Sequence, residues 1–427
     1  MSKEDETVAR PRVLMLAFAC EPDEGSEPEV GWKWANVMAE SCDITVVTQA
    51  KNRERIEQWC RAHPEEHAVL FSYLELGPVW RWLKKRMPGG MYVYYTAWQW
   101  RLRGHVAWLL RERSYDLLHH VTFASFRMPV WVAGLPVVWG PVGGAETAPM
   151  HLLKGHGTLL GRTRERFRNL NTWLAGKLVR LWEPSRRSGG IALASTPATA
   201  GLLSRNGIPC LSMPTIGYDG EIDFVNRGRV AQMQDTPLRL LYVGRLHLLK
   251  GMHLLLEAMA RVEKHSVRLT LVGDGAERVR LESLAGQLGI ADLVSFRGFV
   301  PRRELGGVFS SHDVLVAPSL YESGGLSVLE GFAHCLPAIV LDCGGHALSV
   351  DDSCGRKIPT SGSYEETVSA LADAIRQYVS DPQLALRHGA AAKQRLLEQY
   401  AWPAKKERML TVYRRTLGQE NHVRQPS

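Results

Sequence analysis

Short apolar runs alternate with longer amphipathic stretches through both halves of the chain, and this alternation restricts the fold more than any other feature. In the first half, buried strands are predicted at 13–19, 43–48, 69–74, 116–120, 137–139 and 191–195, and helices near 29–40, 53–62, 98–113 and 197–205. In the second half, strands at 238–243, 267–272, 293–297, 314–317 and 338–341 alternate with helices near 251–263, 276–288, 304–310, 325–335 and 365–379. Each half is therefore predicted to be an α/β domain built on a doubly wound parallel sheet.

A length of 427 residues suits two such domains. The segment 217–235 is polar and lacks periodicity, which predicts a linker between a first domain at 1–216 and a second at 236–402. The last helical stretch, within about 403–427, is expected to return to the first domain. Ligands of such sheets bind beyond the carboxyl ends of the strands, so the active site is expected in the cleft between the domains.

The composition is that of an ordinary globular protein, with 45% hydrophobic and 22% charged residues. The seven cysteines form no Cys-x-x-Cys pair and no zinc-type grouping with histidine, which predicts reduced thiols and a cytoplasmic protein. The amino terminus is acidic where a signal peptide would be basic, and no run approaches the roughly 20 apolar residues that span a bilayer.

The excess positive charge, +8 overall, is concentrated in two stretches. Residues 79–115 hold eight Lys and Arg against one acid, together with five tryptophans, and residues 151–190 hold nine against two acids. Basic residues mixed with tryptophan and tyrosine favour contact with an anionic membrane. Single-stranded nucleic acid is the rival partner, and a solvated basic helix with core-facing tryptophans is the third interpretation.

Two glutamates, Glu322 and Glu330, stand on either side of a glycine pair that opens a helical pattern. Gly324 and Gly325 allow the backbone to turn, and the apolar periodicity starts at Leu326. The first amides of a helix have no intrahelical partner and carry partial positive charge, so the segment offers donors for an anion between two acceptors for hydroxyls. A phosphorylated sugar is the expected ligand, although a lone loop acid such as Glu322 is usually only solvated.

Two further loops after predicted strands carry residues suited to a nucleotide. Arg245 and Lys250 stand around the turn after strand 238–243, where two cations can clamp a diphosphate and absorb the charge that develops as it leaves. Gly298 and Phe299 follow strand 293–297 and offer backbone edges and a ring that can hold a base. The segment 273–275, Gly-Asp-Gly, only partly matches a dinucleotide fingerprint.

Taken together, and in this order and spacing, these segments resemble the retaining family-4 (group 1) glycosyltransferases with the GT-B fold. The resemblance is strong over residues 238–345 and weaker over the first half. It implies two Rossmann-like domains facing each other across a cleft. It also implies a UDP- or GDP-linked sugar as donor substrate and no required cofactor.

The resemblance assigns roles to individual residues. It places Glu322 at the hydroxyls of the donor sugar, Glu330 at the ribose diol, and Arg245 with Lys250 at the diphosphate. The implied donor-binding set is Arg245, Lys250, Gly298, Phe299, Gly324, Gly325, Leu326 and Glu330. One departure concerns Gly324, which stands where the family often has Phe.

The first half is expected to bind the acceptor. Gly25, Ser26 and Glu27 follow the first strand, and the acid of Glu27 suits acceptor hydroxyls. His119 and His120 end the strand at 116–120, where related enzymes carry an active-site histidine. Because consecutive strand residues point to opposite faces, only one of the two can face the cleft, and His119 is the favoured residue.

The implied catalytic set is Glu322, His119, Arg245 and Lys250, acting by positioning and by charge stabilisation rather than as a protein nucleophile. No Asp-x-Asp sequence follows a strand, so no metal site is expected. The basic stretches then suggest a saccharide or polyprenyl-linked acceptor at the inner face of the cytoplasmic membrane, as in surface polysaccharide or glycolipid synthesis, with no nucleic acid involved. A nucleotide-sugar epimerase and a noncatalytic nucleotide- or membrane-binding partner are the alternatives.

Overall fold

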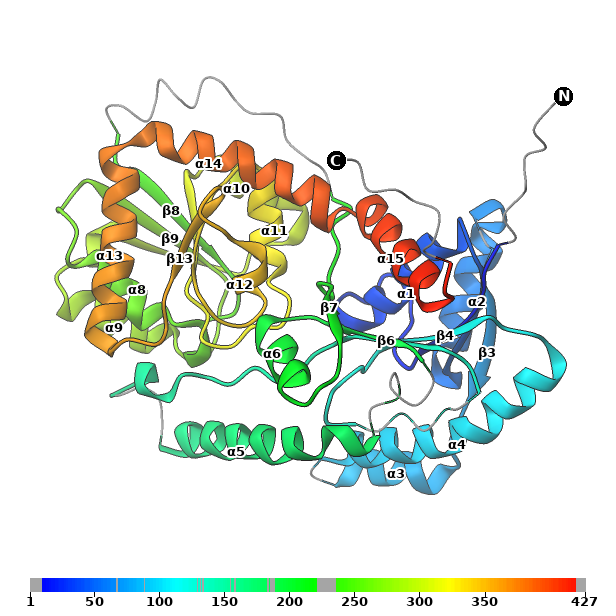
Figure 1. Cartoon of the computed structure of the whole chain (residues 1–427). Coiled ribbons are helices and arrows are strands. Elements are labelled where there is room, and N and C mark those ends of the chain that lie inside the picture. Colours follow the sequence, from blue (N-terminus) through cyan, green and yellow to red (C-terminus); the bar gives the residue numbers. More distant parts are fainter. Residues whose placement is uncertain are drawn as a thin grey trace, which may run out of the picture.

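The computed structural model describes residues 10–419, apart from residues 67, 88, 129, 131, 133, 154, 157–158, 183, 185–188 and 221–235. Within these residues the chain forms two α/β units, each built on one parallel sheet (Figure 1). The predicted doubly wound architecture of both halves is confirmed.

The first unit contains a seven-stranded sheet with the order β3-β2-β1-β4-β5-β6-β7. Its strands are β1 (Arg12–Ala17), β2 (Asp43–Gln49), β3 (Leu70–Leu74), β4 (Leu117–Thr122), β5 (Val137–Val142), β6 (Ile191–Ala194) and β7 (Cys210–Ser212). Its helices are α1 (Ser26–Ala39), α2 (Arg53–Ala62), α3 (Pro78–Arg86), α4 (Gly90–Glu112), α5 (Leu159–Trp182) and α6 (Pro197–Arg205).

The second unit contains a six-stranded sheet with the order β10-β9-β8-β11-β12-β13. Its strands are β8 (Leu238–Val243), β9 (Val267–Val272), β10 (Val294–Gly298), β11 (Val314–Ala317), β12 (Ala338–Leu341) and β13 (Gly355–Ile358). The helices that follow along the chain are α8 (Met252–Met259), α9 (Arg278–Gln287), α10 (Leu305–Ser310), α11 (Leu326–Ala333), α12 (His346–Ser349), α13 (Tyr364–Ser380), α14 (Pro382–Arg395) and α15 (Trp402–Thr416).

Strand β1 shows why these segments are buried on both faces. Leu14 and Leu16 contribute to one hydrophobic core of the first unit, whereas Val13 and Met15 contribute to the core on the other side of the sheet. Successive strand side chains point to opposite faces, so a continuous apolar run is what a sheet covered on both sides requires.

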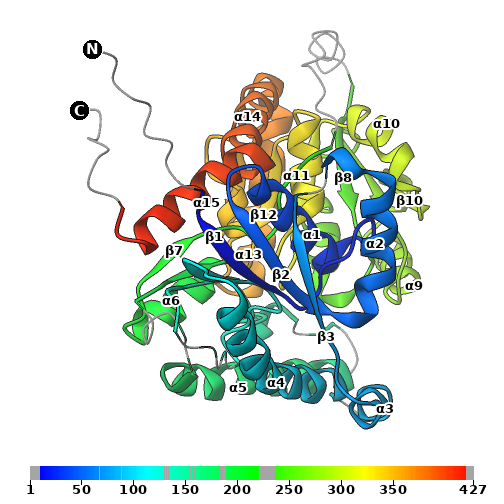
Figure 2. The same cartoon turned by 90° about the vertical axis from the view of Figure 1, so that its right-hand side faces the viewer.

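The chain returns to the first unit at its carboxyl-terminal end, as Figure 2 also shows. Helix α14 continues through a π-turn at Leu396–Tyr400 into α15, and the two helices run along the top of Figure 1 from one unit to the other. Trp402 of α15 packs edge-on against Trp34 of α1, with ring centres 5.2 Å apart. Of the predicted linker, only 217–220 belongs to the described residues, and Tyr218 donates its backbone N–H to the Tyr400 carbonyl.

Candidate functional site

The order of strands locates the site in each unit. In the second sheet the direction of winding reverses between β8 and β11, and in the first sheet between β1 and β4. Loops that leave two such strands diverge and open a crevice at the carboxyl edge of the sheet. The predicted site segments at Gly25, Lys250 and Glu322 lie in the loops after β1, β8 and β11.

The loops after β8 and β11 approach each other closely. A Cβ added to Gly251 would stand 2.0 Å from the Pro318 carbonyl oxygen, so only glycine fits there. This approach brings Lys250 to Glu322, where Nζ donates to Oε2 across 2.5 Å. The predicted site residues Lys250 and Glu322 thus form one ion pair.

Electrostatics keep Glu322 ionised. Burial raises the pKa of this carboxyl, but the charge of the Lys250 ammonium and its hydrogen bond oppose the effect, and the pKa lies below its ordinary value. The Ser323 and Gly324 amides also point at Glu322 Oε1, at 3.1 and 3.4 Å. An ammonium has three N–H donors, so Lys250 can hold Glu322 and still donate to a phosphate oxygen.

Gly325 directly precedes helix α11 and has a left-handed φ of 74°. The buried ring of His346 lies directly behind it, because a Cβ on Gly325 would stand 2.4 Å from His346 Cδ2. Burial lowers the pKa of His346 to about 4, so the ring is neutral at neutral pH. The sequence analysis misses His346 because a single histidine at the start of the short helix α12 belongs to no recognisable motif.

Glu330 lies one turn into α11 with a side chain only 15% exposed. Burial raises its pKa above the ordinary value, although the nearby Arg302 charge lowers it. Glu330 forms a long ion pair with Arg302, whose Nε lies 3.8 Å from Glu330 Oε1. A buried carboxylate with so weak a partner is suited to hydroxyl donors from a ligand.

The other predicted donor residues lie in neighbouring loops. Arg245 is exposed after β8, and its carbonyl accepts a hydrogen bond from the Tyr242 hydroxyl. Gly298 ends β10 with a φ of 71°, and its carbonyl accepts from the Gly273 N–H at 2.8 Å. Phe299 follows with 79% of its surface exposed, so its ring is available for stacking.

A cavity of about 280 Å³ between the units joins the two halves of the site. Gly25 and Ser26 line it from the first unit, and Glu322, Gly324, Gly325 and Leu326 line it from the second. Six of the predicted residues, two from the first unit and four from the second, therefore lie around one cavity. Lining residues that the sequence analysis missed are Glu29, Lys33, Asp219, Arg302 and Trp402.

Glu27 has a different environment from its neighbours. Its Oε1 accepts a hydrogen bond from the Phe123 N–H at 2.5 Å, and burial raises its pKa. Glu29, two residues further along α1, lines the cavity instead. Through this hydrogen bond, Glu27 joins the start of α1 to the loop after β4.

His119 lies in the interior, contrary to the expectation that it faces the cleft. Its side chain is completely buried, with Nε2 2.8 Å from the Gly140 carbonyl and Nδ1 2.7 Å from the Tyr413 hydroxyl. A carbonyl only accepts, so Nε2 carries the proton and Tyr413 donates to Nδ1. Both ring nitrogens are used in joining β4 to β5 and α15.

His120 points to the other face of β4, as the alternation of strand side chains requires. Its Nε2 lies 3.0 Å from the Tyr95 hydroxyl, and its ring is also buried. Burial is the main cause that lowers its pKa, to about 3. The Tyr95 hydroxyl that meets His120 also donates to the Phe123 carbonyl, and the Phe123 N–H donates to Glu27. His120 is thus the histidine whose contacts lead to the start of α1.

Within the described ranges the structure has neither a metal-binding cluster nor a membrane-spanning helix. No group of three or more His, Cys, Asp or Glu side chains is placed to hold a metal ion there. None of the described helices combines the length and the apolar run needed to cross a bilayer.

Sequence comparison matches the second unit to known enzymes. Residues 229–395 match the family model "Glycosyl transferases group 1". A glycosyltransferase of Methanocaldococcus jannaschii is 31% identical over 191 residues, which cover 44% of this chain and 48% of that protein. The D-inositol 3-phosphate glycosyltransferase of Streptomyces avermitilis is 34% identical over 198 residues, covering 44% and 41%. The chain thus spans about half the length of the curated relatives it matches.

Structural comparison extends over both units. Sucrose-phosphate synthase from Thermosynechococcus elongatus superimposes with a TM-score of 0.62 at 20% identity, covering 96% of this chain and all of that one. The lipopolysaccharide outer core galactosyltransferase WaaB gives a TM-score of 0.60 at 14% identity, covering 94% and 99%. The fold is GT-B. The GT-B fold implied by the family resemblance is confirmed, and its two Rossmann-like domains are the units described above.

Proposed function

We propose that this protein is a retaining family-4 glycosyltransferase that moves a hexose from a UDP- or GDP-sugar to a saccharide or polyprenyl-linked acceptor. One observation carries the proposal: the cavity in which the β1 loop of the first domain faces Glu322 and the start of α11 in the second. The match of residues 229–395 to group 1 glycosyl transferases supports it. Complexes of Anabaena HepE with UDP and with UDP-glucose share the fold.

The donor is assigned to the second domain, 236–402. Glu330 binds the ribose diol, because its buried carboxylate needs hydroxyl donors. Glu322 binds the sugar hydroxyls, while Lys250, Arg245 and the amides at the start of α11 bind the diphosphate. Gly298 and Phe299 hold the base at the carboxyl end of β10.

The acceptor is assigned to the first domain, 1–216, which α15 completes. Gly25 and Ser26 reach the cavity directly. His120 and Glu27 act one layer behind them, through Tyr95 and Phe123, and fix the position of the β1 and β4 loops. His119 belongs to the interior and has no role at the reacting atoms.

In the reaction, the bond from the anomeric carbon to the diphosphate oxygen breaks, and a bond to the acceptor oxygen forms on the same face. The acceptor proton passes to the departing diphosphate oxygen. The protein positions both substrates and stabilises the charge on the leaving group through Lys250, Arg245 and the α11 amides. With a lipid-linked acceptor, the transfer would take place at the cytoplasmic membrane, in the synthesis of a surface polysaccharide or glycolipid.

A donor screen by thermal unfolding tests the proposal. A cognate nucleotide sugar at a hundredfold excess over its Kd should add about 2.7 kcal/mol of stability. Lys250→Met and Glu322→Gln should remove most of this gain and lower turnover by about 100-fold or more. Lys264→Met is the control, since exposed Lys264 precedes β9 at the opposite end of the strand from the site.

Three results would contradict the proposal. The first is no thermal shift with any nucleotide or nucleotide sugar. The second is release of an isomerised donor without any acceptor, which identifies an epimerase. The third is full function in Lys250→Met and Glu322→Gln, which identifies a noncatalytic binding partner.

A further inference from the structure

Helices α3, α4 and α5 lie along the same lower edge of the molecule in Figure 1 and Figure 2. Among the described residues, twenty large hydrophobic side chains are exposed, and fourteen of them lie on these three helices. Eight of these fourteen are more than half exposed, namely Val79, Trp82, Tyr92, Trp100, Phe167, Leu170, Trp173 and Leu181. We call the exposed side chains of α3, α4 and α5 the three-helix face. Apolar surface gathered in this way marks an interaction site.

Helix α5 is apolar on two opposite sides. Thr172 and Val179 are buried on one side, where a Cβ on Gly176 would stand 3.0 Å from Leu202 of α6. The other side carries an exposed stripe spaced by three, four and four residues, namely Phe167, Leu170, Leu174 and Leu178. One apolar stripe is enough to hold a surface helix on its domain. The second stripe therefore calls for an apolar environment outside the domain.

The charge of the same helices selects the kind of partner. Together they carry thirteen Lys and Arg residues against two acids, Glu112 and Glu165. Cations also stand over exposed rings, with Lys177 Nζ 3.7 Å from the Trp173 ring centre and the Arg86 guanidinium 5.7 Å from that of Trp82. Rings at the boundary and cations beside them match the headgroup region of an anionic bilayer.

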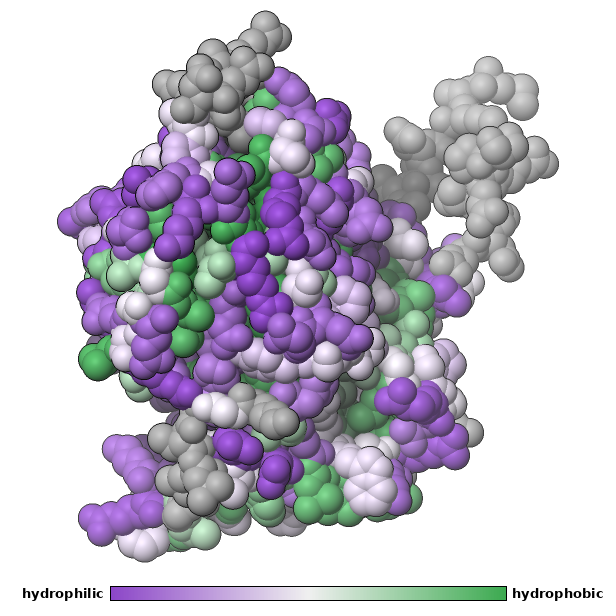
Figure 3. Space-filling view, turned by 90° about the vertical axis from the view of Figure 1, so that its left-hand side faces the viewer, coloured by the Kyte–Doolittle hydropathy of each residue, from purple (hydrophilic) through white to green (hydrophobic). Residues whose placement is uncertain are grey.

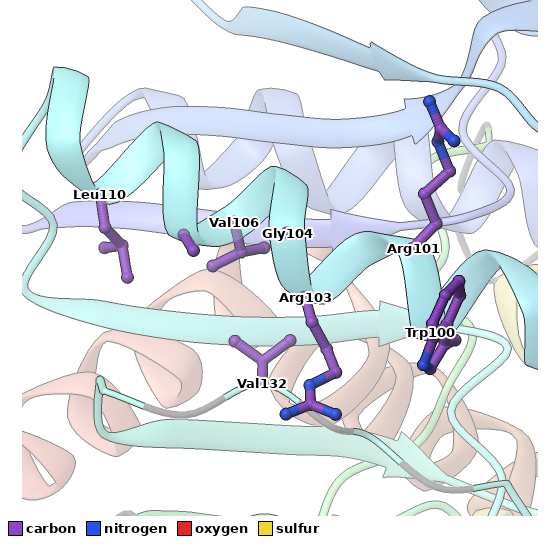
Figure 4. Close-up of a pocket in the computed structure, with 8 residues that line it drawn as sticks. Trp100, Arg101, Arg103, Gly104, Val106, Leu110 and Val132 are labelled. Carbon is purple, nitrogen blue, oxygen red and sulfur yellow. The ribbon is translucent and has the colours of Figure 1, made fainter.

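A groove on α4 adds a place for a headgroup. It holds about 630 Å³ and is walled by apolar side chains, including Val106, Leu110 and Val132. Figure 4 shows Arg103 extending toward Val132 on this side of α4, whereas Arg101 points away from it. An arginine at the mouth of an apolar groove suits a lipid phosphate above its acyl chain.

The other occupants fit less well. A second copy would bring the same excess positive charge against this one, which opposes pairing through this face. A single-stranded nucleic acid would stack its bases on rings, but the α5 stripe is mainly leucine. Figure 3 shows a largely hydrophilic surface over the second domain and green and pale side chains among purple ones along the lower edge, where α5 lies.

We propose that the three-helix face docks the protein on an anionic phospholipid bilayer. The stripe of α5 enters the boundary between headgroups and acyl chains, and the basic residues of α3, α4 and α5 contact lipid phosphates. The exposed tryptophans of α3 and α4 enter the same headgroup boundary. Of the tryptophans on these two helices, only Trp98 is buried in the core, while Trp80, Trp82, Trp100 and Trp108 are exposed.

Cosedimentation with vesicles tests this surface on the full chain. The protein should sediment with vesicles of equal parts phosphatidylcholine and phosphatidylglycerol and remain in solution with phosphatidylcholine alone. Raising the salt concentration should weaken the binding, because the charges lie at an exposed surface. Equal binding to both vesicles, or none to the anionic ones, would overturn the proposal.

Paired substitutions identify the residues. Leu170→Glu with Leu174→Glu should lower vesicle partitioning by about tenfold or more, since it places two charges in the inserted stripe. Val279→Glu is the matched control, because Val279 is 77% exposed on α9 of the second domain. Circular dichroism and nucleotide binding should be unchanged in both variants. Loss of binding in Val279→Glu as well would contradict the assignment to α5.

Tryptophan fluorescence tests the same surface on the unmodified protein, so the result does not depend on the folding of a variant. Vesicles that contain brominated phosphatidylglycerol should quench the tryptophans of the three-helix face, and the emission should shift to shorter wavelength. Single-stranded DNA should leave the emission unchanged. A change of tryptophan emission on adding DNA, without any quenching by the brominated lipid, would identify a nucleic-acid-binding surface and exclude the membrane.

Discussion

The guanidinium of Arg168 lies 3.8 Å from the centre of the Tyr321 ring. Arg168 belongs to α5 of the first domain, and Tyr321 directly precedes Glu322 in the second. Arg168 is also paired with Glu165 on its own helix. The helix that carries the exposed stripe therefore touches the loop proposed to hold the donor sugar.

Removing the Tyr321 ring should weaken this connection. A cation–π contact is worth about 0.5–2 kcal/mol, so Tyr321→Leu should reduce nucleotide-sugar affinity by roughly twofold to thirtyfold. Tyr321→Phe keeps the ring and should bind as the unmodified protein does, which titration calorimetry can compare. Vesicle binding should be equal in all three proteins, and identical affinities for the Leu and Phe variants would argue against the contact.

Glu330→Gln should separate stability from ligand binding. The pKa of Glu330 is raised by burial, so the folded state holds this proton more tightly than the unfolded chain does. Stability is therefore lost as the pH rises above the ordinary carboxyl pKa, and at pH 7 the neutral amide should stabilise the free protein.

The same substitution removes the proposed ribose acceptor. The thermal shift caused by nucleotide should fall in Glu330→Gln although the ligand-free Tm rises. Glu407→Gln, at an exposed position of α15, should change neither quantity. A lower Tm in the ligand-free Glu330→Gln protein would show that the carboxylate is stabilised by Arg302 instead.

Gly325→Ala tests the turn into α11. Alanine would need a left-handed φ of 74° and a Cβ 2.4 Å from the His346 ring, so the turn must shift. A loss of about 1–3 kcal/mol in unfolding free energy and of most nucleotide binding is expected. Gly286→Ala is the control, since a Cβ there meets nothing within 4 Å and α9 should gain slightly.

The sequence predicts the strands of this fold well, because a parallel sheet covered on both faces needs continuous apolar runs such as Val13 to Ala17. It misses β7 and β13, which are short and partly exposed edge strands. It also misses α5, because apolar residues on two sides of a helix leave no single stripe to recognise. The pairing of Lys250 with Glu322 depends on how closely Gly251 approaches Pro318, which no local pattern encodes.

The environment of His119 cannot be predicted from the residues next to it in the sequence. The end of a strand beside a cleft predicts an active-site histidine there, but the Tyr413 hydroxyl of α15, 294 residues away along the chain, occupies Nδ1 of His119. A contact of such separation is fixed by the return of the last helix to the first domain. It follows from tertiary packing and not from the strand.

Acid should destabilise the protein through this buried ring. Burial lowers the pKa of His119 to about 4, while the ring in an unfolded chain titrates near 6.5, so the unfolded state binds the extra proton first. Stability is full above pH 6.5 and falls as the pH drops toward 4, by up to about 3 kcal/mol for this residue. His119→Gln can donate to Gly140 and accept from Tyr413 at every pH, so urea unfolding at pH 7 and pH 5 should show a smaller loss in this variant. His151→Gln, at an exposed position, should keep the full loss, and an unchanged pH slope in His119→Gln would show that His119 does not control the acid transition.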